Sequence, residues 1–394
     1  MNIVNSGSKY VVYGDEVRTF KSLPAETFRV CFSQQEGFFL VKHNDLTVDE
    51  KIYGPYAKKV KKVMDTFEDS HRNLGIILSG PKGVGKSVFG RLLSEEGKKK
   101  GLPTIIVDIG IGGVDSFISS IKQECIVLFD EFEKMFKADD GQQDRLLSLF
   151  DGIDDGKKLF VITCNKTYEL SEYLLNRPGR FHYHFILGSP SYDDAKEYLE
   201  DNLIDSAKGA IPSLLQYHSA NKFTYDVLRA IVQELNNGYD LKETLQDLNV
   251  EKKTRIRIMP VVKFNNGLEA RCDGGVHVDM DNDHQQRVWM TFKSSSIPAG
   301  MSRVINSIAG AFGIAFLTND VKCNANGYFV NTEDVIVIND DWTDRLEAYE
   351  GLTDEEKKAV YDIMVGIDTS EIASFNLRAN SNDDSGWDAR KFDF

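Results

Sequence analysis

The stretch GPKGVGKS, Gly80–Ser87, decides the fold of the region around it. It follows an apolar run at Gly75–Ser79 that reads as a buried strand, and a helical pattern begins at its end, from Ser87 onward. Glycines at this spacing let backbone N–H groups approach a phosphate, and the following helix N-terminus adds a positive dipole. In such a loop Lys86 reaches the β- and γ-phosphates and Ser87 ligates Mg²⁺. We therefore expect a nucleotide-binding loop made of Gly80, Pro81, Lys82, Gly83, Val84, Gly85, Lys86 and Ser87.

The sequence around this loop alternates apolar runs with helical patterns from residue 74 to residue 187. A helix is expected to begin near Pro55, where Val60, Val63, Met64 and Phe67 recur at helical spacing. Buried strands separated by helices are typical of a parallel sheet with helices on both faces. The predicted strands lie in GIILSG, PTIIVDIG, CIVLFDE, KLFVITCN and HYHFIL.

The pattern changes on both sides of this α/β core, which predicts further domains. Residues 1–45 hold short aromatic and β-branched runs, and residues 251–379 mix strand runs with helical ones. In that later region we expect a helix near Met301–Ala311, a buried helix in the apolar window Ile305–Leu317, a hairpin of GYFVN with DVIVIN, and a helix over Asp354–Val365. The expected order is an N-terminal β segment (1–45), the α/β core (46–189), a helical lid (190–250), an α+β domain (251–379) and an acidic disordered tail (380–394).

Two acids follow the strand run IVLF, and an asparagine ends the run FVITCN. Asp130 at the strand end is placed to hold Mg²⁺ through water, and Glu131 to polarise an attacking water. Asn165 is placed to orient that water beside the γ-phosphate, although an asparagine at a strand end is often only a cap. The second acid indicates an ATP hydrolase rather than a switch GTPase.

The stretch NRPGRF places Arg177 and Arg180 on either side of a Pro-Gly turn. It follows the Asn165 strand after one short helix, so an arginine here cannot easily fold back onto its own nucleotide. It can instead enter the nucleotide site of a neighbouring subunit as an arginine finger.

GPKGVGKS, LFDE, ITCN and LLNRPGRF, in this order and spacing, resemble the AAA subgroup of the AAA+ ATPases over residues 45–250. The resemblance implies ATP and Mg²⁺ as cofactors, Arg177 and Arg180 as fingers acting in trans, and Asn165 as the γ-phosphate sensor. KIYG resembles the segment that cradles adenine, which adds Tyr53 and Gly54 to the site. The stretches DEFEK and LLNRPGRFHYHF are also similar to the sequences of ATPases of large tailed bacteriophages. These ATPases in turn are similar to the mitochondrial AAA translocase of a folded iron–sulfur protein.

Two positions depart from the wider family pattern. Leu228 stands where many AAA+ proteins have a lid arginine, which favours the AAA subgroup over clamp loaders and replication initiators. GIGGVDSF, Gly110–Phe117, lacks the usual aromatic pore residue, so Ile111 and Val114 are the side chains expected to line a pore. Threading of unfolded chains and remodelling of a folded partner both stay open.

Charge and composition limit the kinds of partner that the chain is expected to bind. The net charge is −14, which disfavours a dominant grip on nucleic acid. We expect a homo-oligomer, a hexamer in preference to a heptamer, that acts on a protein partner and has no membrane span. The five cysteines are widely spaced without a CxxC, which favours reduced thiols and the cytoplasm, or the host cytoplasm if the chain is phage-encoded.

Other interpretations stay open. An ATPase acting with nucleic acid in phage replication or packaging is one alternative, and a nucleotide-stabilised structural ring is another. His277 and His284 lie among acids in VHVDMDNDH, where an acidic loop is favoured over a metal site. The tail after Asn380 carries aromatics among acids, which suits either docking on a basic pocket or a plain solvated terminus.

Overall fold

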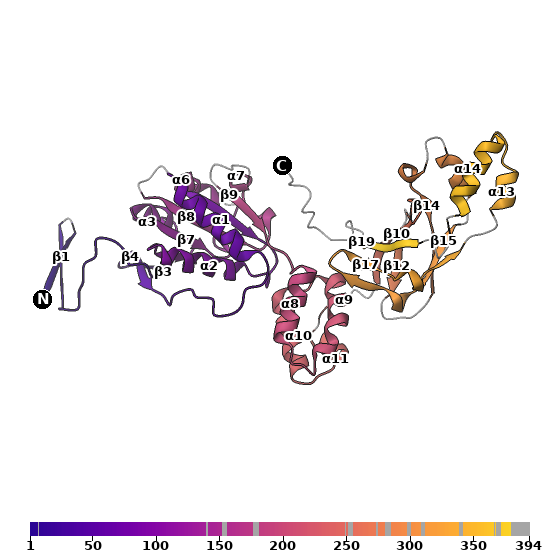
Figure 1. Ribbon diagram of the computed structural model, residues 1–394. Helices are drawn as coiled ribbons and strands as arrows, with labels where there is room; N and C mark the ends of the chain where they lie inside the picture. Colours follow the sequence, from indigo (N-terminus) through magenta and orange to yellow (C-terminus); the bar gives the residue numbers. More distant parts are fainter. Residues whose placement is uncertain are drawn as a thin grey trace. The chain divides into compact units, whose positions relative to one another are not determined.

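The computed structural model divides into two compact units, residues 1–188 and residues 189–394 (Figure 1). It describes residues 1–6, 8–138, 141–151, 156–175, 181–248, 250, 255–272, 275–279, 285–297, 301–308, 312–338, 342–365, 367 and 372–379. The finer domain boundaries expected from the sequence remain predictions.

The first unit is built on a seven-stranded sheet in which every neighbouring pair is parallel except β3 with β4. The predicted parallel sheet is confirmed. Its strands, in sheet order, are β4 (Gly37–Lys42), β3 (Thr27–Ser33), β6 (Thr104–Val107), β7 (Cys125–Phe129), β8 (Lys158–Cys164), β5 (Leu74–Ser79) and β9 (Phe181–Ile186). β5 lies between β8 and β9; from β5 the chain crosses to β6 on one side and later reaches β9 on the other side. This change of direction creates a switch point beside β5, where α/β proteins bind ligands.

Two strands of the expected N-terminal segment belong to this sheet. β3 pairs in parallel with β6, and β4 pairs antiparallel with β3 at the sheet edge. From the sequence both strands are expected before the core, because an antiparallel hairpin has the same pattern whether it stands alone or extends a larger sheet. β1 (Asn2–Ser6) and β2 (Lys9–Tyr13) form a separate two-stranded pair.

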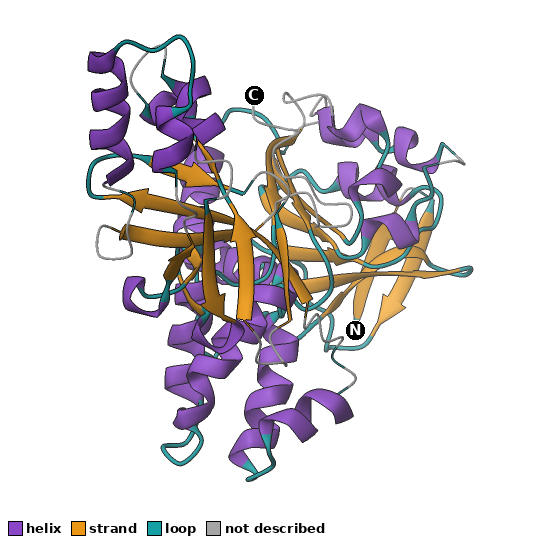
Figure 2. Ribbon diagram, turned by 90° about the vertical axis from the view of Figure 1, so that its right-hand side faces the viewer, coloured by secondary structure: helices purple, strands orange, loops and turns teal. Residues whose placement is uncertain are grey.

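Helices cover both faces of the sheet (Figures 1 and 2). On one face, α2 packs on β7: a Cβ added at Gly97 would stand 2.4 Å from the Ile126 side chain, and one at Gly90 would stand 3.4 Å from that of Leu128. On the other face, β7 contributes Phe129 to an aromatic core that reaches α6. The helices of this unit are α1 (Tyr56–Asp69), α2 (Lys86–Lys99), α3 (Val114–Ser120), α4 (Phe132–Met135), α5 (Gln142–Arg145), α6 (Leu147–Asp151) and α7 (Glu172–Leu175).

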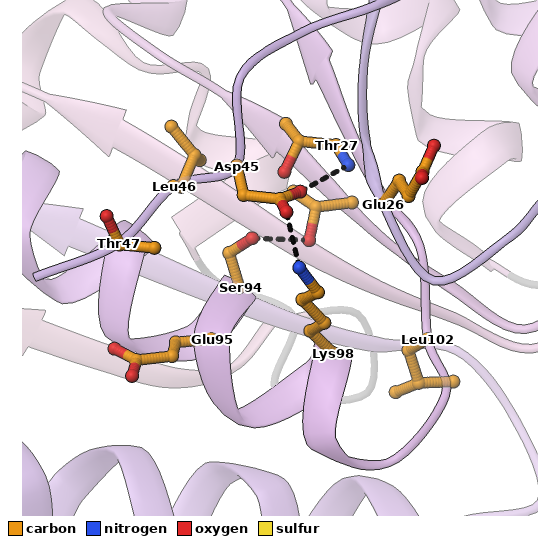
Figure 3. Close-up of a pocket in the computed structure, with 10 residues that line it drawn as sticks. Glu26, Thr27, Asp45, Leu46, Thr47, Ser94, Glu95, Lys98 and Leu102 are labelled. Carbon is orange, nitrogen blue, oxygen red and sulfur yellow. Dashed lines mark hydrogen bonds and ion pairs between the residues drawn. The ribbon is translucent and has the colours of Figure 1, made fainter.

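The N-terminal strands are fastened to α2 by a small polar junction (Figure 3). The Asp45 carboxylate accepts hydrogen bonds from the Lys98 ammonium group and from the Thr27 backbone N–H, and the hydrogen bond from Lys98 is the main cause of the lowered pKa of Asp45. Beside it, the Ser94 hydroxyl donates to the Thr104 hydroxyl at 2.8 Å. The cavity between them measures about 20 Å³, room for a single water molecule. The helix that carries Lys86 is thus tied at its far end to β3 and β6.

The second unit begins with four helices in the range of the predicted helical lid, and we keep the name lid for them. They are α8 (Tyr192–Asn202), α9 (Ile211–Asn221), α10 (Tyr225–Asn236) and α11 (Leu241–Asp247). Ser191, Thr224 and Asp240 cap three of these helices through their side chains, as expected of small polar residues at a helix start. Leu228 in α10 is fully buried, so its side chain packs in the core of the helices.

The lid packs on the strands that follow it. The Gln216 amide donates to the Val321 carbonyl oxygen at 3.2 Å, and the Tyr192 hydroxyl donates to the Cys323 carbonyl oxygen at 3.3 Å. Two antiparallel sheets form this last region, one ordered β14-β11-β10-β19-β17-β16 with β12 also on β10, and one ordered β13-β15-β18. Their strands are β10 (Arg255–Phe264), β11 (Glu269–Arg271), β12 (Val276–Asp279), β13 (Gln285–Trp289), β14 (Thr291–Phe292), β15 (Gly313–Leu317), β16 (Lys322–Asn324), β17 (Gly327–Phe329), β18 (Ile336–Ile338) and β19 (Ile372–Ala379).

The structure corrects two expectations in this region and confirms two others. GYFVN and DVIVIN are not a hairpin, because β17 pairs with β16 and β19 while β18 pairs with β15. The helix expected near Met301–Ala311 is confirmed as α12 (Ser302–Ile308). The window Ile305–Leu317 is not one helix, because α12 is followed by β15, whose Ile314 and Phe316 alternate into the core. The helix over Asp354–Val365 is confirmed as α14, and α13 (Thr343–Glu347) precedes it.

Candidate functional site: a phosphate loop at the switch point

The glycine loop runs from the end of β5 into α2 in a conformation that requires its glycines. Gly80 has φ +149°, and a Cβ there would stand 2.0 Å from the Leu187 carbonyl oxygen. Gly83 and Gly85 have φ values of 78° and 90°, a region that side chains disfavour. α2 begins at Lys86, so the free N–H groups of its first turn face the loop. The loop forms a backbone cradle at a helix N-terminus, which suits a phosphate.

The Lys86 side chain lies against this backbone cradle. Its side chain is largely buried, and its ammonium group donates to the carbonyl oxygens of Gly80 and Pro81 at 2.6 and 2.7 Å. It also donates to the side-chain oxygen of Asn165 at 3.0 Å. Burial lowers the pKa of Lys86, and the negative charge of nearby carboxylates opposes that shift. The cation is thus held beside the loop by weak neutral acceptors that a phosphate can replace.

The acid pair stands at the end of β7, two strands from β5. Asp130 accepts a hydrogen bond of 2.7 Å from the Thr163 hydroxyl, whose oxygen accepts the Glu131 N–H at 2.8 Å. Glu131 itself has φ +52°, an uncommon conformation for a non-glycine residue. Its carboxylate pairs with the Lys134 ammonium at 2.5 Å, and this hydrogen bond is the main cause of the lowered pKa of Glu131.

Asn165 joins the two halves of the site. β8 lies between β5 and β7 in the sheet, so the residue that ends it stands between the loop and the acids. The Asn165 amide nitrogen lies 2.8 Å from Glu133 and 3.5 Å from Glu131, while its oxygen accepts from Lys86. The structure therefore brings together Lys86, Asn165 and Glu131 as a connected group.

Three further residues of the site escaped the sequence analysis. Thr163 shares a face of β8 with Asn165 two residues later, and this period-2 spacing could have revealed it. The Tyr56 hydroxyl donates to the Val84 carbonyl oxygen at 2.5 Å and so supports the loop from α1. Glu133 reads in sequence as one more solvated acid, yet it is 5% exposed.

The remaining predicted site residues lie nearby along the chain. Ser87 is exposed in the first turn of α2. Tyr53 is half-buried with the Lys51 ammonium 5.2 Å from its ring centroid, and Gly54 has φ +81° just before α1. Arg177 and Arg180 lie outside the described residues, in the segment between α7 and β9.

Three other expectations bear on function. Ile111 is 37% exposed, but Val114 is 2% exposed, so Val114 packs in the core and does not line a pore in this structure. It faces inward because it begins α3, which packs on α6. Of the acidic stretch VHVDMDNDH, the part up to Asp279 is described and the rest is not; within the described residues no group of three or more potential ligands could hold a metal ion. The tail after residue 379 also lies outside them.

These features define the class: a phosphate-loop α/β domain with an acid pair and a polar residue on the strand between. Residues 76–189 match the family model described as ATPase family associated with various cellular activities (AAA). The chain therefore carries an AAA ATPase domain. Within the described residues no helix is long and apolar enough to cross a membrane.

Curated relatives agree with this domain. The chain is 23% identical over 225 residues to a putative cell division cycle ATPase of Plasmodium falciparum, which is 50% of this chain and 18% of that protein. It is 25% identical over 221 residues to the ATP-dependent zinc metalloprotease FtsH of Clostridium perfringens, which is 47% of this chain and 30% of that protein. The matches thus span less than a third of these relatives.

A solved structure of a RuvB mutant from Thermotoga maritima is also similar. Its TM-score is 0.38 at 16% identity, with 51% of this chain and 72% of that chain covered.

Proposed function

We propose that this chain is an ATP hydrolase that forms a homo-oligomeric ring, a hexamer, and uses hydrolysis to remodel a protein partner. One observation carries the proposal: Lys86, Asn165 and Glu131, which come from the ends of three different parallel strands or their loops, form one hydrogen-bonded group. A phosphate-binding cation and an acid joined through a polar side chain suit hydrolysis of a terminal phosphate.

The residues fit ATP with Mg²⁺. The Gly80 cradle leaves room only for backbone, the first turn of α2 presents free N–H groups, and Lys86 is already within the loop. Ser87 and Asp130 supply the oxygen ligands that Mg²⁺ prefers, and Tyr53 with Gly54 would lie along the adenine. Bound Mg²⁺ supplies neutralisation of the charge that develops on the phosphates.

Three side chains of the site then have different roles in hydrolysis. Lys86 leaves the Gly80 and Pro81 carbonyl oxygens for the β- and γ-phosphates. Glu131 accepts the proton of the attacking water, and Asn165 orients that water from beside the γ-phosphate. The ion pair with Lys134 keeps Glu131 ionised and therefore able to accept a proton.

The ring follows from Arg177 and Arg180, proposed to complete the site of the neighbouring subunit. A mixing experiment tests it. Glu131→Gln and Arg180→Ala subunits are each expected to be inactive alone, because every site then lacks one component. In mixed rings an Arg180→Ala subunit keeps Glu131 and receives Arg180 from its neighbour, so activity should return. An Arg180→Ala protein that hydrolyses ATP normally, or mixtures that stay inactive at every ratio, would refute action in trans.

A protein partner is favoured over nucleic acid by the net charge of −14 and by relatives named as ATP-dependent metalloproteases, whose substrates are proteins. The ATPase rate should respond little to single- or double-stranded DNA. Strong stimulation by DNA that weakens with salt would instead support the replication or packaging alternative. The narrower kinship with phage ATPases and the mitochondrial translocase remains a prediction.

A further inference from the structure

We propose that Glu133 is a positioning residue for ATP hydrolysis, acting through Asn165; this inference rests on the proposed function. One oxygen of the Glu133 carboxylate accepts two hydrogen bonds from the same residue, from the Asn165 backbone N–H at 2.9 Å and from its side-chain amide at 2.8 Å. Two bonds to one residue fix both the position of its backbone and the rotation of its side chain.

The surroundings determine which way the Asn165 amide points. Its nitrogen faces two carboxylates and its oxygen faces the Lys86 ammonium group. Only this orientation satisfies all three neighbours, because an amide nitrogen donates and an amide oxygen accepts. Lys86 holds the oxygen end of the amide, and Glu133 provides the short bond to its nitrogen end, whereas Glu131 lies at 3.5 Å.

The burial of Glu133 argues against an ordinary surface acid. It is 5% exposed, and its second carboxylate oxygen is buried without a hydrogen-bond partner among the described residues. Burying a carboxylate costs free energy unless it is hydrogen-bonded or paired with a charge, so the two hydrogen bonds from Asn165 offset part of this cost. Here they hold the end of β8 between the phosphate loop and the acid pair.

The consequence appears when Lys86 turns to a phosphate and leaves the Asn165 oxygen. The short bond to Glu133 is then the main contact that keeps the orientation of the amide, and the second N–H still points toward Glu131, where the attacking water is expected. Without Glu133 only the long contact of 3.5 Å with Glu131 holds the amide nitrogen, so the amide can rotate away from the position in which it orients the water. Hydrolysis should therefore suffer, while nucleotide binding, which uses the loop, should not.

The test compares kcat and the dissociation constant for ATP in Glu133→Met, which keeps the size and removes both acceptors, and in Glu133→Gln, which keeps one acceptor oxygen. We expect Glu133→Met to lower kcat ~10- to 100-fold, as expected for a reacting group displaced by about 1 Å. Its affinity for ATP should stay within a factor of ~3, and Glu133→Gln should recover most of the rate because neutral acceptors still bind. If Glu133→Met does not fold, Glu133→Asp, with its acceptor one methylene shorter, should show the same pattern.

Asn73→Ala is the matched structural control. Asn73 also holds β8 by accepting a backbone N–H, that of Lys158 at 2.8 Å, but at the opposite end of the strand. A double-variant cycle completes the design: in an Asn165→Ala background, Glu133→Met should lower kcat no further.

The inference is overturned if Glu133→Met lowers kcat no more than Asn73→Ala does, if Glu133→Gln is as impaired as Glu133→Met, or if the two losses multiply in the double variant. These outcomes require a wild-type protein that turns over ATP. A wild-type protein that binds but never hydrolyses ATP would instead refute the proposed function.

Discussion

The Thr163 hydroxyl donates a hydrogen bond of 2.7 Å to the Asp130 carboxylate, and its oxygen accepts the Glu131 backbone N–H. A single side chain of β8 thus fixes both acids that follow β7. Because Thr163 is 1% exposed, water cannot replace these bonds if the hydroxyl is removed. The acid pair therefore depends on a neighbouring strand as well as on its own.

Replacing Thr163 by Val should separate this role from side-chain volume. Thr163→Val keeps the shape but leaves the Glu131 N–H without its partner, which costs about 1–3 kcal/mol of the free energy of unfolding. We also expect a higher Mg²⁺ requirement for ATPase activity, since Asp130 loses its orienting bond. Urea unfolding and a Mg²⁺ titration measure the two effects. Thr163→Ser retains the hydroxyl and should restore both; equal Mg²⁺ requirements for Val and Ser would contradict the prediction.

Lys86→Met tests the cation of the loop. The ammonium group donates hydrogen bonds to Gly80, Pro81 and Asn165. We expect phosphate oxygens to replace these acceptors when ATP binds. Loss of a charged hydrogen bond costs about 1.5–3 kcal/mol, or roughly a 10- to 150-fold weaker affinity for ATP. Titration with a fluorescent ATP analogue measures it. Lys99→Met, an exposed lysine at the other end of α2, is the control; similar affinities for the two variants would exclude a phosphate role.

The sequence predicted the sheet well because its strands are continuous buried runs. All six residues of β5 and all seven of β8 are buried, and such runs between helical patterns leave few other folds. The loop, the acid pair and Asn165 could be placed for the same reason, since the carboxyl ends of parallel strands meet at one edge.

What the sequence left out depends on contacts between distant residues. Glu133 and Thr163 act through Asn165 and Asp130, 32 and 33 residues away. Sheet membership was missed for β3, because a hairpin pattern does not reveal which strand it will join. The split of Ile305–Leu317 into a helix and a strand depends on the pairing of β15 with β13 and β18, which local periodicity does not contain.

Gly80→Ala should show how closely β9 confines the loop. The added Cβ would stand 2.0 Å from the Leu187 carbonyl oxygen, and the backbone at φ +149° disfavours any side chain. Overpacking of this kind costs about 1–3 kcal/mol, so we expect a lower thermal midpoint together with weaker ATP binding. Gly188→Ala, next to Leu187, is the control, because its Cβ would meet nothing within 4 Å. A Gly80→Ala protein as stable as Gly188→Ala would show that the loop can move away from Leu187.

His218 predicts a pH dependence of stability in the lid. Its ring is 2% exposed; Nε2 hydrogen-bonds the Pro190 carbonyl oxygen at 2.9 Å, and Nδ1 is buried without a partner among the described residues. Burial is the main cause that lowers the pKa of His218, the charge of Lys222 adds to it, and the bond to Pro190 opposes it. The folded protein therefore holds this ring neutral to a lower pH than the unfolded chain does.

The sign follows from proton binding. An unfolded histidine titrates at about 6.5, so below that pH the unfolded chain binds a proton that folded His218 still refuses. The free energy of unfolding should fall as the pH drops from about 7.5 to about 5.5, and the fall should end only below the folded pKa. His218→Gln, which can still donate to Pro190, should reduce this fall, measured as the difference in urea midpoints at the two pH values. His71→Gln, at an exposed histidine, should leave it unchanged. If His218→Gln and the wild type lose the same stability over this range, the lid does not titrate through His218.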